Sequence, residues 1–200
     1  YDYSKELFKN VIKLESLEEG EIIKLTTNSY RALSFIFSNE ISRIANIYGL
    51  SGSNLIEKAN FGYNRNNIAK PSLGIGGYCL PKDPILFSEN FQKNSNYKLG
   101  KITNEISKST TTYFANKFIK ILKKQKNIKK ILMMGIAFKG LPETIDIRNS
   151  TSLEIVNKIN KKNVQFSGYD PLGSKLKKIV KNKRLKILDK KFDINIYEMI

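Results

Sequence analysis

The sequence contains no histidine and only one cysteine, Cys79, among 200 residues. A single cysteine cannot form an internal disulfide bond, which agrees with a reducing compartment. Because no imidazole is present to pair with the thiol, the composition argues against a papain-like protease. Cys79 is therefore either an inert small hydrophobe, the commonest fate of a lone cysteine, or a nucleophile of another kind.

Long apolar runs are missing as well. No stretch reaches the length of about 18 apolar residues that a membrane-spanning helix needs. The first residues, YDYSKELFKN, lack the apolar core of a signal peptide. We therefore expect a soluble, cytoplasmic chain without membrane contact. With 40% hydrophobic residues, the chain can bury one core or two small ones.

Acidic residues are scarce, with 18 Asp and Glu against 35 Lys and Arg, so the formal net charge is +17. Such a charge raises the possibility of nucleic-acid binding. However, the lysines occur with many Asn and Ile, as in KKQKNIKK, a bias that AT-rich coding also produces. No nucleic-acid-binding motif with interleaved aromatic residues is present. We therefore expect an anionic small molecule, such as a nucleotide diphosphate, and no nucleic acid.

Residues 1–128 are predicted to be helical. Apolar residues recur at spacings of three and four over residues 20–49, which predicts a helix of about 28 residues. The average helix in globular proteins has only about 12 residues, so this one suits a central strut or a subunit interface. A shorter helix should follow from Ser53, as N-cap, to Asn60. A second long helix should span about 98–126, with lysines at its C-terminal end.

Between these helices, residues 61–83 are rich in Gly, Asn and Pro, and we predict a functional loop. After residue 128 the pattern changes. Ile131–Gly135 is an apolar run of strand length, and a polar loop, a helical pattern and a second short strand, VQFSGYDP, follow. This order is the unit of a parallel α/β sheet. We place the domain boundary near Asn127.

Lys24 and Asn28 lie four positions apart and therefore project from one face of the first long helix. The simplest interpretation is a solvated helix face. A lysine and an amide on a rigid helix can also fix an oxyanion, the lysine by its charge and the amide by its NH₂ group. This second interpretation requires the cysteine segment to lie opposite them.

Cys79 follows a glycine-rich turn, in which Gly76 and Gly77 permit positive φ angles and a close approach of backbone to ligand. The spacing is not that of the dinucleotide-binding G-x-G-x-x-G pattern, and no strand precedes it. With a lysine nearby in the sequence, the thiol could act as a nucleophile on a carbonyl carbon. Asp83 would then be a candidate base for the water that releases the acyl group.

A third group of charged residues, Lys139, Asp146 and Arg148, lies in the loop between the predicted strand and helix of the α/β part. Open α/β sheets bind ligands in such loops, at the carboxyl ends of their strands. Arg148 could form a forked contact with a phosphate or carboxylate. The alternative is a surface ion pair with Asp146.

Three segments in this order resemble the UDP-glucose/GDP-mannose dehydrogenase family. EIIKLTTNSYRALSFIFSNE is similar to its central-helix pattern, PSLGIGGYCLPKDP to its Gly-Gly-x-Cys-x-Pro-Lys-Asp nucleophile loop, and GIAFKGLPETIDIRNSTSL to its Ala-Phe-Lys…Asp-x-Arg-x-Ser signature. The spacing is also similar. The resemblance runs from about residue 1 to Pro171, whereas the tail, RLKILDKKFDINIYEMI, does not clearly match.

The resemblance implies oxidation of the C6 alcohol of a UDP-sugar to a uronate with two NAD⁺. Cys79 matches the nucleophile that captures the intermediate aldehyde as a thiohemiacetal, which is then oxidised to a thioester. Lys24 and Asn28 match the oxyanion and water-positioning pair. Asp83 matches the carboxylate that assists the acid/base steps.

The resemblance also implies five substrate-binding residues. Arg65, in YNRNN, falls where family members place a sugar-nucleotide-binding arginine, and its surroundings favour the acetamido-sugar branch. Lys139 and Arg148 match substrate-binding positions, the arginine reaching into a neighbouring subunit's site in the family's dimers. Gly76 and Gly77 belong to the nucleophile loop and are expected to contact the substrate.

The 200 residues contain no G-x-G-x-x-G dinucleotide domain and no Pro-Glu-Phe-like segment, so the resemblance predicts a fragment. We predict an α/β chain overall, with an all-α central dimerisation domain over residues 1–128 and a partial Rossmann-like nucleotide-sugar-binding domain over residues 129–200. No NAD-binding residue can be assigned, no metal is expected, and a separate chain could supply the NAD domain. We expect a homodimer that is inactive alone.

Two alternatives remain open. The chain could be a non-catalytic, dimeric nucleotide-sugar-binding module, although a pure binder has no need of a thiol together with Lys24 and Asp83. A basic nucleic-acid binder is the other alternative, and it depends on charge alone.

Overall fold

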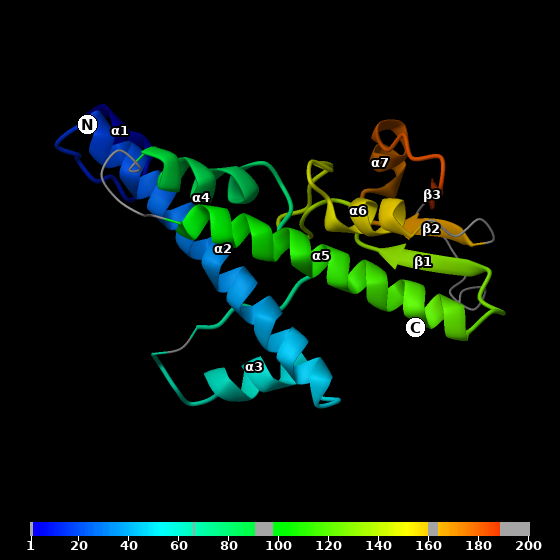
Figure 1. The fold of residues 1–200 in the computed structure, drawn as a ribbon. Helices are drawn as coiled ribbons and strands as arrows, with labels where there is room; N and C mark the ends of the chain where they lie inside the picture. Colours follow the sequence, from blue (N-terminus) through cyan, green and yellow to red (C-terminus); the bar gives the residue numbers. More distant parts are fainter. Residues whose placement is uncertain (1, 66, 91–97, 160–163, 189–200) are drawn as a thin grey trace.

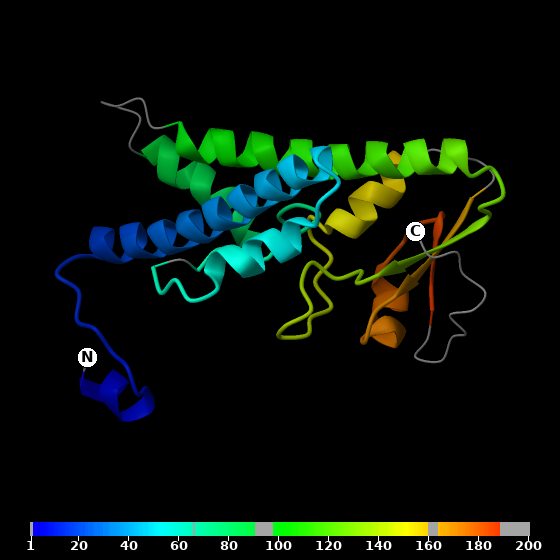
Figure 2. The ribbon, with the colours of Figure 1, turned by 90° about the horizontal axis from the view of Figure 1, so that it is seen from below.

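The structure is a computed structural model that describes residues 2–65, 67–90, 98–159 and 164–188. Two long helices cross each other and carry the shorter elements (Figure 1). Seen from below, the second long helix extends from the helical end of the molecule to the end that holds the sheet, and two short helices lie beside the sheet (Figure 2). None of the helices in these ranges is both long and apolar enough to span a membrane.

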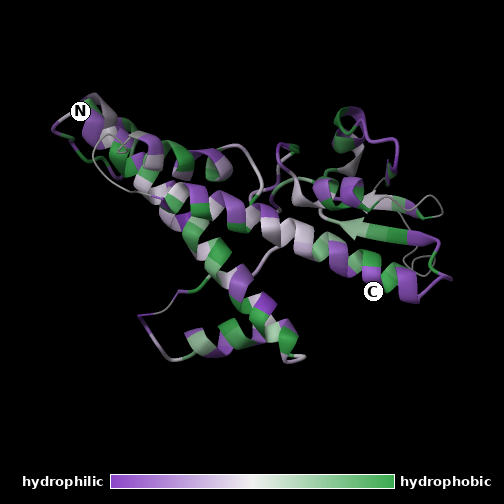
Figure 3. Cartoon of the chain, viewed as in Figure 1, coloured by the Kyte–Doolittle hydropathy of each residue, from purple (hydrophilic) through white to green (hydrophobic). Residues whose placement is uncertain are grey.

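The first long helix, α2 (Leu17–Ile47), confirms the predicted strut and has 31 residues. It begins after Ser16, whose hydroxyl accepts a hydrogen bond from the Glu19 amide at 3.2 Å. A short helix, α1 (Asp2–Leu7), precedes it. Hydrophobic residues recur along the whole of α2 (Figure 3). Only one side is covered, and its buried residues are Leu25, Ser29, Ala32, Ile36, Ser38, Asn39, Ser42 and Ala45.

The next helix, α3 (Gly52–Asn60), starts earlier than predicted. Its N-cap is Ser51, whose side chain accepts a hydrogen bond from the Asn54 amide, so the prediction of Ser53 as the cap is wrong. The reason is close packing against α2, because a Cβ atom at Gly52 would lie 2.5 Å from the Ser42 Cα atom. Only glycine permits this approach, and the Ser51 side chain caps the helix directly before it.

The predicted loop over residues 61–83 is wrong at its end, because residues 79–83 form the first turns of α4 (Cys79–Asn90). The prolines in this segment had suggested a loop. Pro81 lies in the first helical turn, where an absent N–H is tolerated because it has no intrahelical partner. The next helix, α5 (Leu99–Lys124), ends with the predicted lysines. It packs closely on α4, since a Cβ atom at Gly100 would lie 1.7 Å from the Pro84 carbonyl oxygen.

The remaining elements form the predicted parallel α/β unit. A sheet with the order β1-β2-β3 is accompanied by two helices, and these elements are β1 (Lys130–Met134), α6 (Thr151–Lys158), β2 (Gln165–Tyr169), α7 (Gly173–Ile179) and β3 (Leu185–Ile187). Both strand pairs are parallel, with Ile131 opposite Phe166 and Phe166 opposite Leu185. The sequence did not reveal β3, because a strand of 3 residues is too short for a periodicity signal.

The main hydrophobic core lies between this sheet and its helices, and α5 contributes Ala115 and Leu122 to it. In Figure 2, α6 lies between α5 and the sheet. The long helix therefore belongs to both halves, and contacts α4 along its first part and α6 further on. The α/β class is confirmed. The exact domain boundary near Asn127 stays a prediction.

Candidate functional site

Three polar side chains from α2 and α4 gather around a fourth, Asp83, which is 0% exposed. Its Oδ2 atom accepts hydrogen bonds from Lys24 Nζ at 2.6 Å and Asn28 Nδ2 at 2.6 Å. Lys82 Nζ lies 3.1 Å from the Oδ1 atom. We call these four residues, Lys24, Asn28, Lys82 and Asp83, the Asp83 cluster. The predicted condition is met, because the cysteine helix does lie opposite Lys24 and Asn28.

Helical spacing explains how the cluster reaches Cys79. Lys24 and Asn28 are separated by four positions on α2, and Cys79 and Asp83 by four positions on α4, so each pair shares one helix face. The thiol is exposed, one helical turn before the buried carboxylate. The hydrogen bond to Asp83 raises the pKa of the Lys24 ammonium, and the negative charge of Asp83 raises it further. Lys24 is therefore a cation held against the same face of α4, one turn from Cys79.

The protonation state of Asp83 follows from a balance of opposing effects. Burial alone would raise the pKa of its carboxyl group, but the hydrogen bonds from Lys24, Asn28 and Lys82 outweigh burial and lower the pKa below its ordinary value. The group is ionised at neutral pH. A carboxylate with a lowered pKa is a weak proton acceptor, so this geometry suits the orientation of Lys24 and Asn28 better than the activation of water.

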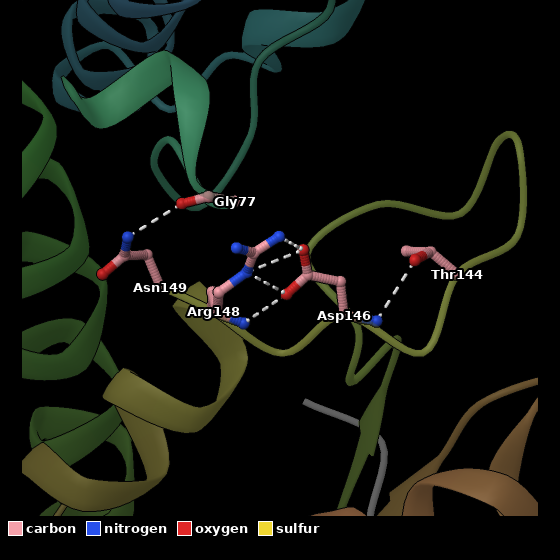
Figure 4. A network of polar contacts seen from close by, with 5 residues as sticks. All are labelled: Gly77, Thr144, Asp146, Arg148 and Asn149. Carbon is pink, nitrogen blue, oxygen red and sulfur yellow. Dashed lines mark hydrogen bonds and ion pairs between the residues drawn. The ribbon is translucent and has the colours of Figure 1, made fainter. Parts of the chain in front are cut away.

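Arg148 forms a surface ion pair with Asp146, the alternative left open beside a forked ligand contact (Figure 4). Its Nη2 atom donates to Asp146 Oδ2 at 2.6 Å, and its Nε atom lies 3.0 Å from both carboxylate oxygens. These hydrogen bonds lower the pKa of Asp146. The guanidinium carbon also lies 4.8 Å from the ring centroid of Tyr78, the residue before Cys79.

The glycine turn packs against the loop after β1. Gly77 has a φ of +85°, and a Cβ atom there would lie 2.8 Å from the Phe138 ring. A Cβ atom at Gly76 would lie 2.9 Å from the Asn149 carbonyl oxygen. Both glycines are thus required by neighbouring atoms of this chain, and their contact with a substrate stays a prediction.

The two remaining predicted substrate-binding residues, Lys139 and Arg65, are not part of the Asp83 cluster. Lys139 is exposed, with its Nζ atom 5.5 Å from the Phe138 ring centroid. Arg65 is exposed in the segment after α3, which packs on the far end of α2 (Figures 1 and 2). Within the part of the chain that the structure describes, Arg65 makes no polar contact with the Asp83 cluster. The single chain does not bring it to Cys79.

Three polar or aromatic residues near the site were not predicted, namely Tyr78, Asn149 and Asp170. Asp170 accepts hydrogen bonds from the amides of Ile136 and Ala137 at 2.9 and 3.1 Å, which fixes the turn that follows β1. The signal for Asp170 was its place between a strand and a proline. Tyr78 and Asn149 gave no such signal, because their contacts join segments that are distant in the sequence.

Two family models match this chain. The central domain of the UDP-glucose/GDP-mannose dehydrogenase family matches residues 18–109, and the UDP-binding domain of the same family matches residues 132–197. The second match extends beyond Pro171, so the prediction that the tail is unlike the family is wrong. The tail carries no motif residue, and its short strand β3 gave no pattern to recognise.

Individual relatives agree with these models. A UDP-N-acetyl-D-mannosamine dehydrogenase of Pyrococcus horikoshii is 32% identical over 84% of this chain and 41% of its own length. A UDP-glucose 6-dehydrogenase of Campylobacter jejuni subsp. jejuni is 31% identical over 90% of this chain and 43% of its own length. A solved structure of the UDP-D-ManNAc dehydrogenase from Pyrococcus horikoshii has a TM-score of 0.64 at 32% identity, covering 75% of this chain and 35% of that one.

This chain therefore spans less than half the length of the relatives it matches. Two models of one family cover most of its residues, in the family's order. The resemblance seen in the sequence motifs is confirmed, and the chain belongs to the UDP-glucose/GDP-mannose dehydrogenase family.

Proposed function

We propose that this chain is the central and UDP-binding portion of a nucleotide-sugar 6-dehydrogenase, which oxidises the C6 alcohol of a UDP-sugar to a carboxylate. One observation carries the proposal. Lys24 and Asn28 converge on the buried Asp83 carboxylate, one turn of α4 away from the exposed thiol of Cys79. A nucleophile, a cation and an amide donor on two packed helices are the groups needed for covalent capture of a carbonyl.

The first step assigned to this chain is capture of the C6 aldehyde. The Cys79 thiolate attacks the carbonyl carbon, a C–S bond forms, and the π electrons of the carbonyl move to its oxygen. Lys24 stabilises the oxyanion by its charge, and protonation of that oxygen completes the thiohemiacetal. Asp83 holds Lys24 in place, since its carboxylate accepts from the ammonium group.

NAD⁺, when bound, accepts a hydride in each of the two oxidations. The 200 residues contain no G-x-G-x-x-G pattern that would hold it, so the hydride transfers are not assigned to them. The second step assigned to this chain is hydrolysis of the thioester. Water attacks the acyl carbon, the C–S bond breaks, and its electron pair returns to the Cys79 sulfur. Of the two protons of the water, one passes to that thiolate and the other to solvent as the carboxylate forms. Asn28 and Lys24 hold the oxygen atoms in this step.

For the substrate we propose a UDP-activated N-acetylhexosamine. The support is the Arg65 segment, YNRNN, together with a relative named UDP-N-acetyl-D-mannosamine dehydrogenase. UDP-glucose is the second candidate, since another relative is named UDP-glucose 6-dehydrogenase at nearly the same identity. Lys139 and Arg148 are proposed to contact the diphosphate, and Arg65, Gly76 and Gly77 the rest of the nucleotide sugar.

The test uses capture without oxidation. The chain is mixed with a UDP-sugar that carries a ¹³C-labelled aldehyde at C6, and ¹³C NMR follows the labelled carbon. We expect a thiohemiacetal signal that Cys79→Ser abolishes, while UDP binding measured by calorimetry is retained. Binding of UDP with no thiohemiacetal in the native chain would favour the non-catalytic module instead. An N-acetylated and a non-acetylated UDP-sugar, compared by the same titration, decide between the two substrates.

We also propose a homodimer formed by α2. Four large apolar residues, spaced by seven, lie exposed along this helix, namely Ile23, Tyr30, Phe37 and Ile44. Their exposed fractions lie between 48% and 69%. A stripe repeated every seven residues is typical of helices that pack along their length, and a second copy offers the same stripe. Light scattering should show a dimer that Phe37→Glu dissociates, whereas Leu141→Glu, at an exposed site in the α/β half, should leave it intact.

A further inference from the structure

Asn149 joins the α/β half to the glycine turn that precedes Cys79. Its Nδ2 atom donates to the Gly77 carbonyl oxygen at 2.8 Å, and the Gly77 amide donates to the Arg148 carbonyl oxygen at 2.9 Å. Figure 4 shows the Asn149 amide directed at Gly77, beside the Arg148–Asp146 pair. The N–H and the C=O of Gly77 are thus both hydrogen-bonded to two consecutive residues of the α/β half, Arg148 and Asn149.

The backbone of Asn149 is part of this contact. Its φ is +50°, which makes it a non-glycine residue in the left-handed region. Asparagine and aspartate tolerate this conformation better than most residues, because a short polar side chain can hydrogen-bond locally. Only asparagine also offers the NH₂ donor that the Gly77 carbonyl needs.

The Gly77 segment determines where the thiol lies. Gly77 is two positions before Cys79, the first residue of α4, and the ring of Phe138 prevents its backbone from moving toward the α/β half. On the other side, Asp83 fixes the next turn of the same helix to α2. The thiol is therefore held between two attachments, one in each half of the molecule.

We propose that Asn149 is a positioning residue for Cys79. It holds the start of α4 so that Cys79 stays one turn from Asp83 and its partner Lys24, next to the Tyr78 ring on which the Arg148 guanidinium lies, although Asn149 itself does not take part in the chemistry. The half of the molecule that matches the UDP-binding domain thereby determines the position of the nucleophile, which belongs to the other half. The inference rests on the proposed function only for the identity of the group that the thiol attacks; the positioning of the thiol by Asn149 does not depend on it.

The test exploits Cys79 as the only thiol of the chain. Alkylation rates are measured with iodoacetate, an anion, and iodoacetamide, which is neutral, and their ratio reports the positive potential at the sulfur independently of its exposure. Asn149→Ala removes the amide and disfavours the left-handed backbone, Asn149→Gly removes only the amide, and Asn149→Asp places a carboxylate against the Gly77 carbonyl. Asn157→Ala, on the exposed side of α6, is the matched control.

We expect the ratio to fall by about threefold in all three Asn149 variants, because charge interactions weaken steeply when the sulfur moves away from the cations. The ratio of Asn157→Ala should equal that of the native chain. An unchanged ratio in folded Asn149→Ala, as judged by circular dichroism, would overturn the proposal. If that variant does not fold, Asn149→Gly decides in the same way. Since no UDP-sugar is used, failed aldehyde capture by the native chain would refute the proposed function and leave this result standing.

Discussion

The two halves of the molecule neutralise their charged groups in different ways. In the helical half, Lys24 and Asn28 reach Asp83 across 59 and 55 positions of sequence, and the carboxylate is 0% exposed. In the α/β half, Arg148 pairs with Asp146 only two positions away, and both side chains contact solvent. The first arrangement depends on how α2 packs against α4, whereas the second is formed within one loop.

This difference predicts different energetic consequences. A buried carboxylate that loses its partners keeps its desolvation cost, so breaking the Asp83 cluster should destabilise the fold. An exposed ion pair contributes little, because water and salt screen it. The loop pair should therefore contribute little to stability, while the Asp83 cluster holds two helices together.

The largest effect is expected from Gly100, the glycine that lets α5 approach α4, the helix that carries Asp83. Gly100→Ala places a Cβ atom 1.7 Å from the Pro84 carbonyl oxygen, so α4 or α5 must move. We expect a loss of about 3 kcal/mol in the free energy of unfolding, measured with urea.

The matched substitution in the sheet is Gly168→Ala. There the new Cβ atom meets methyl groups of Ile136 and Ile187 at 2.8 and 3.0 Å, and these side-chain ends can shift. The loss should be smaller, about 1 kcal/mol. Equal losses in the two variants would show that the helical half is no more tightly fixed than the sheet.

The second prediction compares the two carboxylates directly. Asp83→Asn keeps the size of the side chain but removes the charge that Lys24 and Lys82 face, and we expect it to cost about 2 kcal/mol of stability. Asp146→Asn should cause no measurable loss. Both are checked by urea unfolding at neutral pH, and a larger loss for Asp146→Asn would invert the comparison.

The third prediction concerns acid. The pKa of Asp83 is lowered in the folded state from an ordinary value of 3.8, so its stabilising contribution is present above that value and disappears as the pH falls through the folded pKa. Urea midpoints measured from about pH 5 to about pH 2 should fall more steeply for the native chain than for Asp83→Asn. Parallel curves would mean that Asp83 titrates alike in both states.

The smallest effect is expected on thiol reactivity. If Lys24 stands beside the sulfur, Lys24→Ala should slow alkylation of Cys79 by iodoacetamide near neutral pH by about threefold, because a cation favours the thiolate. The native chain should also react faster than a free model thiol. Lys101→Ala, an exposed lysine on α5, serves as the control. A native thiol that reacts slowly and is insensitive to Lys24 would indicate a merely structural cysteine.

Much of the fold could be predicted because it depends on patterns of neighbouring residues. The apolar spacing of α2 and the apolar run of β1 are properties of contiguous residues, and so are the lysines that end α5. The errors have equally local causes. The prolines near the start of α4 led to the prediction of a loop there, and the start of α3 was placed too late. In both cases the outcome depended on packing, which adjacent residues do not specify.

The sequence by itself determined the two long helices, the β1-α6-β2 unit with its parallel α/β class, and the motifs of the family, since each depends on residue types at short spacing. For Arg148 it left two possibilities, a forked ligand contact and an ion pair with Asp146, and the structure shows the ion pair. Only the tertiary structure decided that Lys24 and Asn28 share one buried carboxylate, and that Asn149 holds the turn before Cys79. Those contacts join residues more than 50 positions apart, and no local spacing specifies where packed helices and loops finally meet.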